Sequence, residues 1–204
     1  MKKKSIVILV TAVVLMLSVS VGGMLAYFSD TKTATNTFTV GDVNIELTET
    51  NWDSSAAHVI VPGASFTKNP VVTVKSGSQE SYVRMLVTID HVSKWDEVFK
   101  DKGGANLRDI FTGYNEEKWG YAGESCDANA DTITYEFRYA TTVNAVSGDE
   151  ELEPLFTSVV IPSDLDDELE VFNDVNSLNI VVKADAIQAL TFADADAAWE
   201  AFSK

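Results

Sequence analysis

The sequence is poor in cysteine. Cys126 is the single cysteine among 204 residues, which excludes an intramolecular disulfide. Stability must therefore come from a packed core, and a chain of this length with 46% hydrophobic residues and four prolines fits one globular domain. Cys126 stands in the polar stretch GESCDANAD, which predicts a loop. Because the Cys/His context of a thiol hydrolase is missing, we interpret Cys126 as a bystander thiol.

Histidine is also scarce, and this argues against a zinc peptidase. Such enzymes usually hold one ion with two histidines a helical turn apart and use a glutamate as general base. The chain has His58 and His91 only, with no H-E-x-x-H motif, and both stand where a predicted strand begins or ends. A glycine-rich phosphate loop and a G-x-S-x-G elbow are absent as well. We therefore predict no catalytic residues, no metal and no enzymatic activity.

Basic residues are outnumbered by acidic ones, 15 against 31, and the formal net charge is −16. This balance argues against nucleic acid or an anionic lipid surface as a partner. Two acidic stretches, SGDEELE (147–153) and SDLDDELE (163–170), could supply carboxylates to Ca²⁺. Neither has the ligand spacing and turn glycine of an EF-hand loop. We interpret them as a solvated acidic face and predict no cofactor, with Ca²⁺ at these loops as the alternative.

The single long hydrophobic run lies at the N-terminus. Three lysines (residues 2–4) precede the apolar stretch from residue 6 to residue 21, which is the order of a signal peptide. The stretch is shorter than the roughly 20 residues of a membrane-spanning helix. We predict a signal peptide over residues 1–26, cleaved between Ala26 and Tyr27, which changes the formal net charge to −19. Retention of the run as a membrane anchor is the alternative.

Alternation with a period of two dominates the rest of the chain and predicts strands. The clearest case is TITYEFRYATTV, where Ile133, Tyr135 and Phe137 share one face. Similar patterns occur over residues 43–47, 72–74, 83–89, 155–162 and 178–188. We expect residues 72–74 and 83–89 to form a hairpin around the polar SGSQES, and seven or eight strands to make two packed sheets. The fold class is therefore mainly β.

Short helices are predicted in the connections. Ser93 is placed to cap a helix that contains Trp95 and Phe99, and Gly103-Gly104 would end it. Apolar spacing predicts further short helices near residues 107–111 and 165–172. A C-terminal helix with Trp199 and Phe202 should cover an open end of the sandwich.

The segment GGMLAYFSDTKTATNTFTVGDVNIEL resembles the signal-peptide junction and first strand of the TasA/camelysin family. The resemblance continues in VPGASFTKNPVVTVKSGSQESYVRMLVTI, EPLFTSVVIP and IVVKADAIQAL. It implies a jelly-roll-like antiparallel β-sandwich and secretion from a Gram-positive bacterium after processing by a SipW-type signal peptidase. For TasA-like members it also implies fibres of the cell surface or biofilm matrix, with the chain itself or homologous subunits as partners.

The segment after the cleavage point is the candidate for assembly. We expect residues 27–40 to be an assembly strand and residues 41–204 to be the sandwich domain with its C-terminal helix. Main-chain hydrogen bonds would add this strand to a neighbouring subunit, with Tyr27, Phe28, Phe38 and Val40 as apolar anchors. Alternatively the segment is an intramolecular edge strand or a frayed terminus.

Two other functions remain open. Trp52, Trp95, Trp119 and Tyr114 could form a carbohydrate-binding platform, which would make the protein a monomeric cell-surface binding module. Aromatic residues of this kind more often fill a core. Camelysin-like metalloendopeptidase activity follows from the resemblance alone, because the residues of a zinc peptidase motif are missing.

Overall fold

The computed structural model describes residues 29–32, 43–52, 60–100, 106–165, 168–172, 175 and 178–202. The predicted signal peptide, with its cleavage residues, lies outside this part, and so does His58. The predicted anchors also lie outside the described residues: Tyr27, Phe28, Phe38 and Val40.

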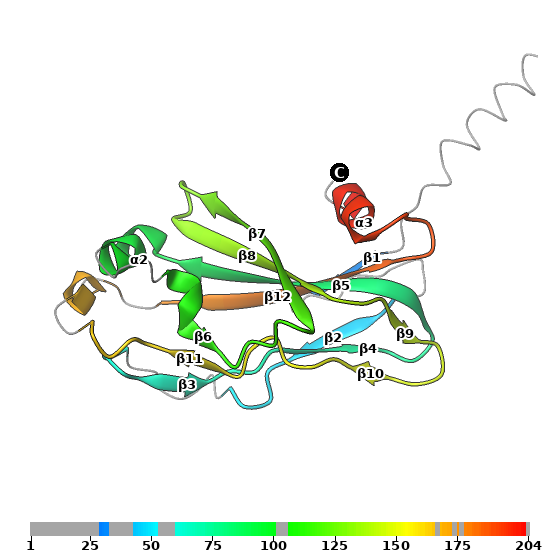
Figure 1. Cartoon of the computed structure of the whole chain (residues 1–204), viewed down its shortest axis with the longest axis horizontal. Coiled ribbons are helices and arrows are strands. Elements are labelled where there is room, and N and C mark those ends of the chain that lie inside the picture. Colours follow the sequence, from blue (N-terminus) through cyan, green and yellow to red (C-terminus); the bar gives the residue numbers. More distant parts are fainter. Residues whose placement is uncertain are drawn as a thin grey trace, which may run out of the picture.

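Two layers of antiparallel strands form the molecule (Figure 1). The first layer is one sheet with the strand order β1-β12-β5-β8-β7 and a short strand, β9, paired to β5. Its strands are β1 (Ser29–Lys32), β12 (Ile180–Gln188), β5 (Ser78–Asp90), β8 (Thr132–Tyr139), β7 (Trp119–Asp127) and β9 (Val143–Ala145).

The second layer consists of two three-stranded sheets. One has the order β10 (Glu150–Glu151), β4 (Val71–Val74) and β2 (Ile45–Thr48), and the other has the order β3 (Ser65–Thr67), β11 (Ser158–Val160) and β6 (Phe111–Thr112). Every pairing among the described strands is antiparallel. The predicted mainly β, antiparallel sandwich is confirmed.

The core lies between the layers and follows from the alternation. In β5 the core-facing residues are fully buried, namely Val83, Met85, Val87 and Ile89. They lie directly opposite core-facing residues of β8 and β12, and β2 and β4 contribute buried valines and Ile45 from the other layer. Burial of one such side chain stabilises the fold by about 1.5–3 kcal/mol.

The predicted hairpin between residues 72–74 and 83–89 is wrong. β4 pairs with β2 and β10, whereas β5 belongs to the other layer. The chain changes layer at a tight turn, where the Ser78 amide donates to the Lys75 carbonyl and Gly77 has a φ of 90°. Part of the polar SGSQES stretch is strand rather than turn, because β5 already begins at Ser78.

Helices lie in the connections, as predicted: α2 (Val92–Phe99), η1 (Leu107–Ile110), η2 (Glu168–Phe172) and α3 (Ala195–Phe202). The predicted cap of α2 is wrong. His91 stands at the N-cap with a φ of 56° and caps nothing with its side chain. The Ser93 hydroxyl instead donates to the Asp131 carboxylate, which also accepts the Ser93 amide.

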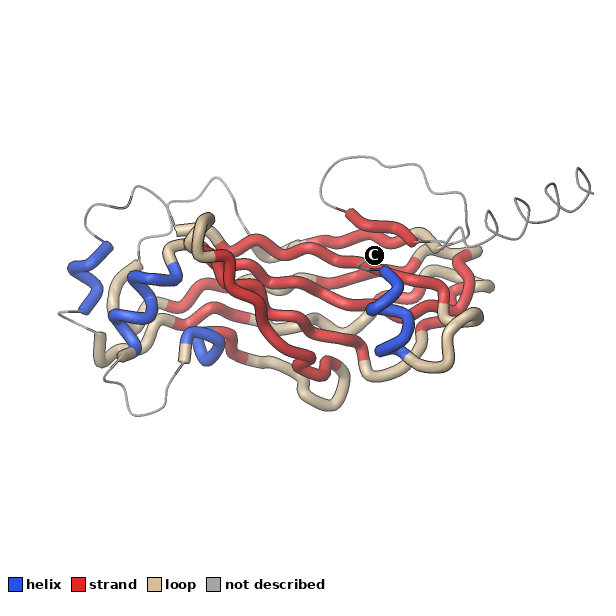
Figure 2. Tube along the Cα trace, turned by 90° about the horizontal axis from the view of Figure 1, so that it is seen from above, coloured by secondary structure: helices blue, strands red, loops and turns tan. Residues whose placement is uncertain are grey.

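The C-terminal helix was predicted to cover an open end of the sandwich, and this prediction is wrong. α3 lies on the outer face of the six-stranded sheet (Figure 2). There Trp199 packs against Ile187 of β12, while Trp199 and Phe202 contact the guanidinium group of Arg84 at 4.5 and 4.9 Å. The helix lies on this face because Ile187 and Arg84 there provide an apolar contact and a cation for the aromatic rings of α3.

Candidate assembly site at the β12 edge

The β12 edge of the large sheet is partly covered by the N-terminal segment. β1 pairs with β12 in the same chain, and Ser29 lies opposite Ile187 and Lys32 opposite Ala184. The four described residues of the predicted assembly segment are therefore an intramolecular edge strand in this structure. This is the alternative that the sequence left open.

The first half of β12 has a free edge within the described part of the chain. Ile180 to Lys183 pair with β5 on one side, but β1 reaches only residues 184–187 on the other. Val181 on this half is 56% exposed. An edge of this kind presents unpaired backbone groups that another extended segment can bind.

An apolar pocket of about 290 Å³ opens beside this free edge, between the two layers. Leu178, two residues before β12, and Ile180, its first residue, border the pocket, and α2 contributes Trp95. Other lining residues come from the opposite layer and its loops, namely Trp52, Ile60, Phe66, Lys68, Val159 and Ile161. The pocket is thus placed where a strand added to β12 would turn its core-facing side chains.

Two polar groups in the pocket wall differ in how they are satisfied. The Lys68 ammonium is almost fully buried, and it is neutralised by Glu49 at 2.7 Å and lies 4.7 Å from the centre of the Trp52 ring. The Trp95 indole is 2% exposed, and its Nε1–H has no acceptor among the described residues. A buried donor without an acceptor costs about 1–3 kcal/mol, so the Trp95 indole is the less well satisfied of the two groups.

The outer face of β12 is fixed by a buried ion pair. Nε and Nη2 of Arg84 donate to the Asp185 carboxylate at 3.1 and 2.9 Å, and Asp185 is fully buried. Two further ion pairs complete the charge cluster. Lys183 lies 3.2 Å from the Asp185 carboxylate, and Glu136 lies 3.5 Å from the Arg84 guanidinium group. Thr31 of β1 lies directly opposite Asp185, so the ion pair holds the part of β12 to which β1 binds.

Comparison with known proteins identifies the family. The first 104 of the 204 residues match the camelysin metallo-endopeptidase family. The chain belongs to the camelysin family. The match extends from the N-terminus through β5 and α2, which confirms the resemblance found in the sequence. No curated protein and no solved structure matches the chain.

Camelysin membership implies an extracellular or cell-surface protein. No helix within the described ranges is long and apolar enough to cross a membrane. The predicted secretion from a Gram-positive bacterium goes further than family membership and stays a proposal.

The metal ion implied by the name metallo-endopeptidase does not fit the described residues. No group of three His, Cys, Asp or Glu side chains there could hold a metal ion. His91 has a carboxylate neighbour in Asp131, but both oxygens of that carboxylate already accept hydrogen bonds from Ser93. These hydrogen bonds lower the pKa of Asp131 below its ordinary value.

The other candidates of the sequence occupy different places. Trp95 and Trp119 are buried in the core, so they form no exposed platform, whereas Trp52 and Tyr114 are half-buried. Cys126 is exposed, but the predicted loop is wrong, because this residue belongs to β7 and lies opposite Ile133. In the first acidic stretch, Asp149 binds Lys75 and the Ser76 amide. The absence of a cofactor stays a prediction, with Ca²⁺ at the acidic loops as its alternative.

Sequence reasoning missed the Arg84–Asp185 pair and the pocket beside β12. The two charged residues are 101 positions apart, and each occupies an ordinary polar position of an alternating strand. The one available signal is that both strands are long and apolar on the other face. This pattern is typical of central strands, whose polar positions can be buried when a helix packs on the outer face.

Proposed function

We propose that the protein is an exported structural subunit of cell-surface or biofilm-matrix fibres, assembled by donor-strand addition along β12. The observation that supports this most is the half-filled β12 edge beside the apolar pocket. Family membership supports an extracellular role.

The register of β1 indicates how a longer strand would fit. Its continuation past Lys32 would place Ala34 opposite Val182 and Phe38 opposite Leu178, which lines the pocket. Directly opposite residues of an antiparallel pair share one face, so Phe38 would point toward the pocket. Its ring would then be buried against the apolar walls of the pocket.

The sequence of the segment suits such a strand. Hydroxyl residues occupy every second position on the face that register assigns to the outside: Ser29, Thr31, Thr33, Thr35, Thr37 and Thr39. On the other face, Ala34, Asn36, Phe38 and Val40 follow Asp30 and Lys32, which lie opposite small alanines of β12. This second face is polar at Asp30, Lys32 and Asn36 and becomes apolar at Phe38 and Val40, so only the end that would reach the pocket has the pattern of a buried face.

Exchange of this strand between subunits would build a fibre. The pairing of β1 with its own β12 shows a register that a second chain could use equally, as in domain swapping. Because donor segment and acceptor edge are different surfaces, the contact is heterologous and open, so it continues into a filament. Cleavage after Ala26 by a SipW-type signal peptidase would free the donor, with copies of this chain or homologous subunits as partners.

Single-cysteine variants distinguish exchange from intramolecular pairing. In a Cys126→Ser background, Ala34→Cys and Val182→Cys are placed in separate chains, which are mixed under assembly conditions and oxidised. Opposite residues of an antiparallel pair lie about 4.5–5.5 Å apart at Cα, within disulfide range. We expect a cross-linked dimer from the mixture, and little from the control that carries Thr35→Cys in place of Ala34→Cys.

The outcomes separate the two candidate functions. If the mixture gives no dimer while one chain carrying both cysteines forms an internal disulfide, the segment is an intramolecular strand and the donor-strand proposal is wrong. The observed β1 pairing favours this second candidate, a monomeric cell-surface binding module. N-terminal sequencing of exported protein tests processing separately, because cleavage as proposed gives Tyr27 as the first residue.

A further inference from the structure

A groove lies under the β7–β8 hairpin, at the opposite edge of the large sheet from β12. The hairpin rises away from the sandwich, above η1 and β6 (Figure 1). A register shift between Tyr121 and Gly123, where Gly123 has a φ of 142°, places Glu124 opposite Tyr135. Tyr121 lies opposite Phe137, so the bulge brings Tyr121 and Glu124 onto the same face, above the groove.

Two adjoining cavities of about 510 and 600 Å³ make up this groove and share Arg108 and Tyr121. Six aromatic residues border the first, namely Phe111, Tyr114, Trp119, Tyr121, Phe137 and Phe156. Four of them are buried, whereas Tyr114 is half-buried and Tyr121 is 42% exposed. The second is bordered by Phe99 of α2, Tyr135 of β8 and Glu124. Together they offer an elongated surface rather than a closed pocket.

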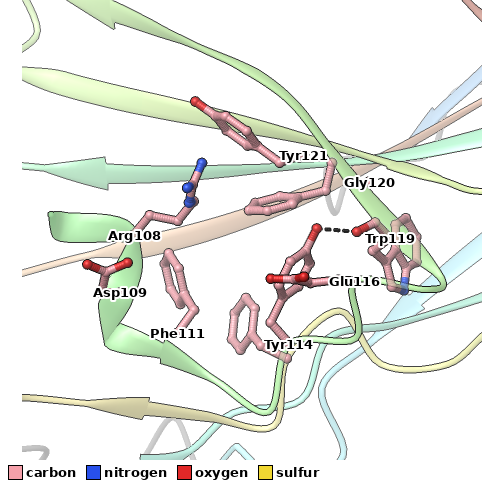
Figure 3. A pocket seen from close by; sticks show the side chains of 10 residues that line it. Arg108, Asp109, Phe111, Tyr114, Glu116, Trp119, Gly120 and Tyr121 are labelled. Atoms are coloured by element: carbon pink, nitrogen blue, oxygen red, sulfur yellow. Dashed lines mark hydrogen bonds between the residues drawn. The ribbon is translucent and has the colours of Figure 1, made fainter. Parts of the chain in front are cut away.

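Polar side chains that can form hydrogen bonds lie on both sides of the first cavity. The Arg108 guanidinium stacks on the Tyr121 ring at 3.9 Å, and no carboxylate in the described part of the chain lies within ion-pair distance of it. The Tyr121 hydroxyl donates to Glu124 at 2.8 Å, which fixes the ring. Figure 3 shows Glu116 across the cavity from Arg108, with the aromatic rings between them. The cavity therefore offers one donor group, Arg108, and two carboxylate acceptors, Asp109 beside it and Glu116 across from it.

We propose that this groove binds a neutral polysaccharide strand. A sugar ring has an apolar C–H face, which suits the exposed ring of Tyr121, and hydroxyls that both donate and accept hydrogen bonds. Glu116 and Asp109 can accept from such hydroxyls, and Arg108 can donate to them. One cation against two carboxylates in the first cavity, on a chain of net charge −16, disfavours an anionic glycan.

Isothermal titration calorimetry tests this proposal with cellohexaose and chitohexaose as neutral probes and a hyaluronan hexasaccharide as the anionic probe. We expect one neutral probe to bind the purified protein and the anionic probe to bind at least about tenfold more weakly, a difference of about 1.4 kcal/mol. Tyr121→Ala and Arg108→Ala should each weaken neutral binding by about tenfold or more.

Matched variants separate stacking from folding. Tyr121→Phe keeps the ring and loses only the hydroxyl that binds Glu124, so it should bind nearly as the wild type does. Tyr121 is 42% exposed, and an unchanged melting temperature of the alanine variants shows that the fold is intact. The proposal is overturned if neither neutral probe binds, if the anionic probe binds more tightly, or if both alanine variants bind as the wild type does.

Discussion

Replacing Phe38 with aspartate should suppress fibre assembly, whereas the same replacement at Thr37 should have little effect. Both changes add one negative charge to the same segment. In the proposed donor strand, which would continue the β1 register beyond Lys32, Phe38 would face the pocket side of β12 and Thr37 would face the outside. Thr37→Asp is therefore a matched control for charge, position and strand propensity.

The expected size of the effect follows from the pocket. Its walls are mostly apolar and its volume is about 290 Å³, so loss of the Phe38 ring removes about 1.5–3 kcal/mol of apolar burial. A carboxylate at that place is not compensated, because the Lys68 ammonium is already paired with Glu49 at 2.7 Å, and an unpaired buried charge adds several kcal/mol. Since about 1.4 kcal/mol corresponds to a factor of ten, the concentration needed for assembly should rise by about 100-fold or more.

Sedimentation of fibres over a concentration series measures this directly, with negative-stain microscopy to identify the sediment. Circular dichroism of the monomer shows whether either variant has lost its fold. Equal critical concentrations for Phe38→Asp and Thr37→Asp in folded proteins would refute the reasoning, since they would show that the two faces of the segment are equivalent.

Three further predictions concern stability and chemistry. Arg84→Met should lower the free energy of unfolding, measured by urea denaturation, by about 3–5 kcal/mol, because it leaves the fully buried Asp185 without its hydrogen-bonded cation. The double variant Arg84→Met with Asp185→Leu should recover most of that loss. The pKa of Asp131 is held below its ordinary 3.8 mainly by a backbone N–H at the start of α2, so its contribution to stability is present above pH 3.8 and is lost as pH falls through the lowered pKa. The difference in stability between wild type and Asp131→Asn should accordingly shrink in acid, and a constant difference down to pH 2 would contradict this assignment. Purified protein should show no chelator-sensitive cleavage of casein, and cleavage that disappears in a variant with His58→Ala and His91→Ala would prove this prediction wrong.

The elements that the sequence predicted correctly are those whose signal is local. β8 alternates strictly, and α2 and α3 carry apolar residues at helical spacing, so their neighbours along the chain already determine which side is buried. The partner of each strand is a different matter. β4 and β5 are joined by a short polar stretch that reads as a hairpin turn, yet the turn at Gly77 carries the chain into the other layer.

The candidate sites were less predictable because they depend on contacts between distant residues. β7 was missed since eight of its nine residues are not buried and a bulge interrupts its period. β7 forms one wall of the groove, so a prediction without β7 cannot contain the groove. The sequence also gives no signal that Arg108 stacks on Tyr121. The apolar pocket likewise needs α2, β3, β11 and β12 together, whereas the Thr-rich segment proposed to fill it could be identified from the sequence alone.

The proposed fibre contact and the proposed polysaccharide groove are compatible because they use opposite edges of one sheet. In the order β1-β12-β5-β8-β7, two strands separate β12 from β7, so a donor strand on β12 leaves the aromatic groove open. The bulge at Tyr121 and Gly123 also makes β7 a poor edge for strand addition, which directs strand exchange to β12. If both proposals hold, preassembled fibres should bind the neutral hexasaccharide with the same affinity per subunit as the assembly-deficient Phe38→Asp monomer. A loss of sugar binding on assembly would show that the groove is covered in the fibre, and the two surfaces could then not act together.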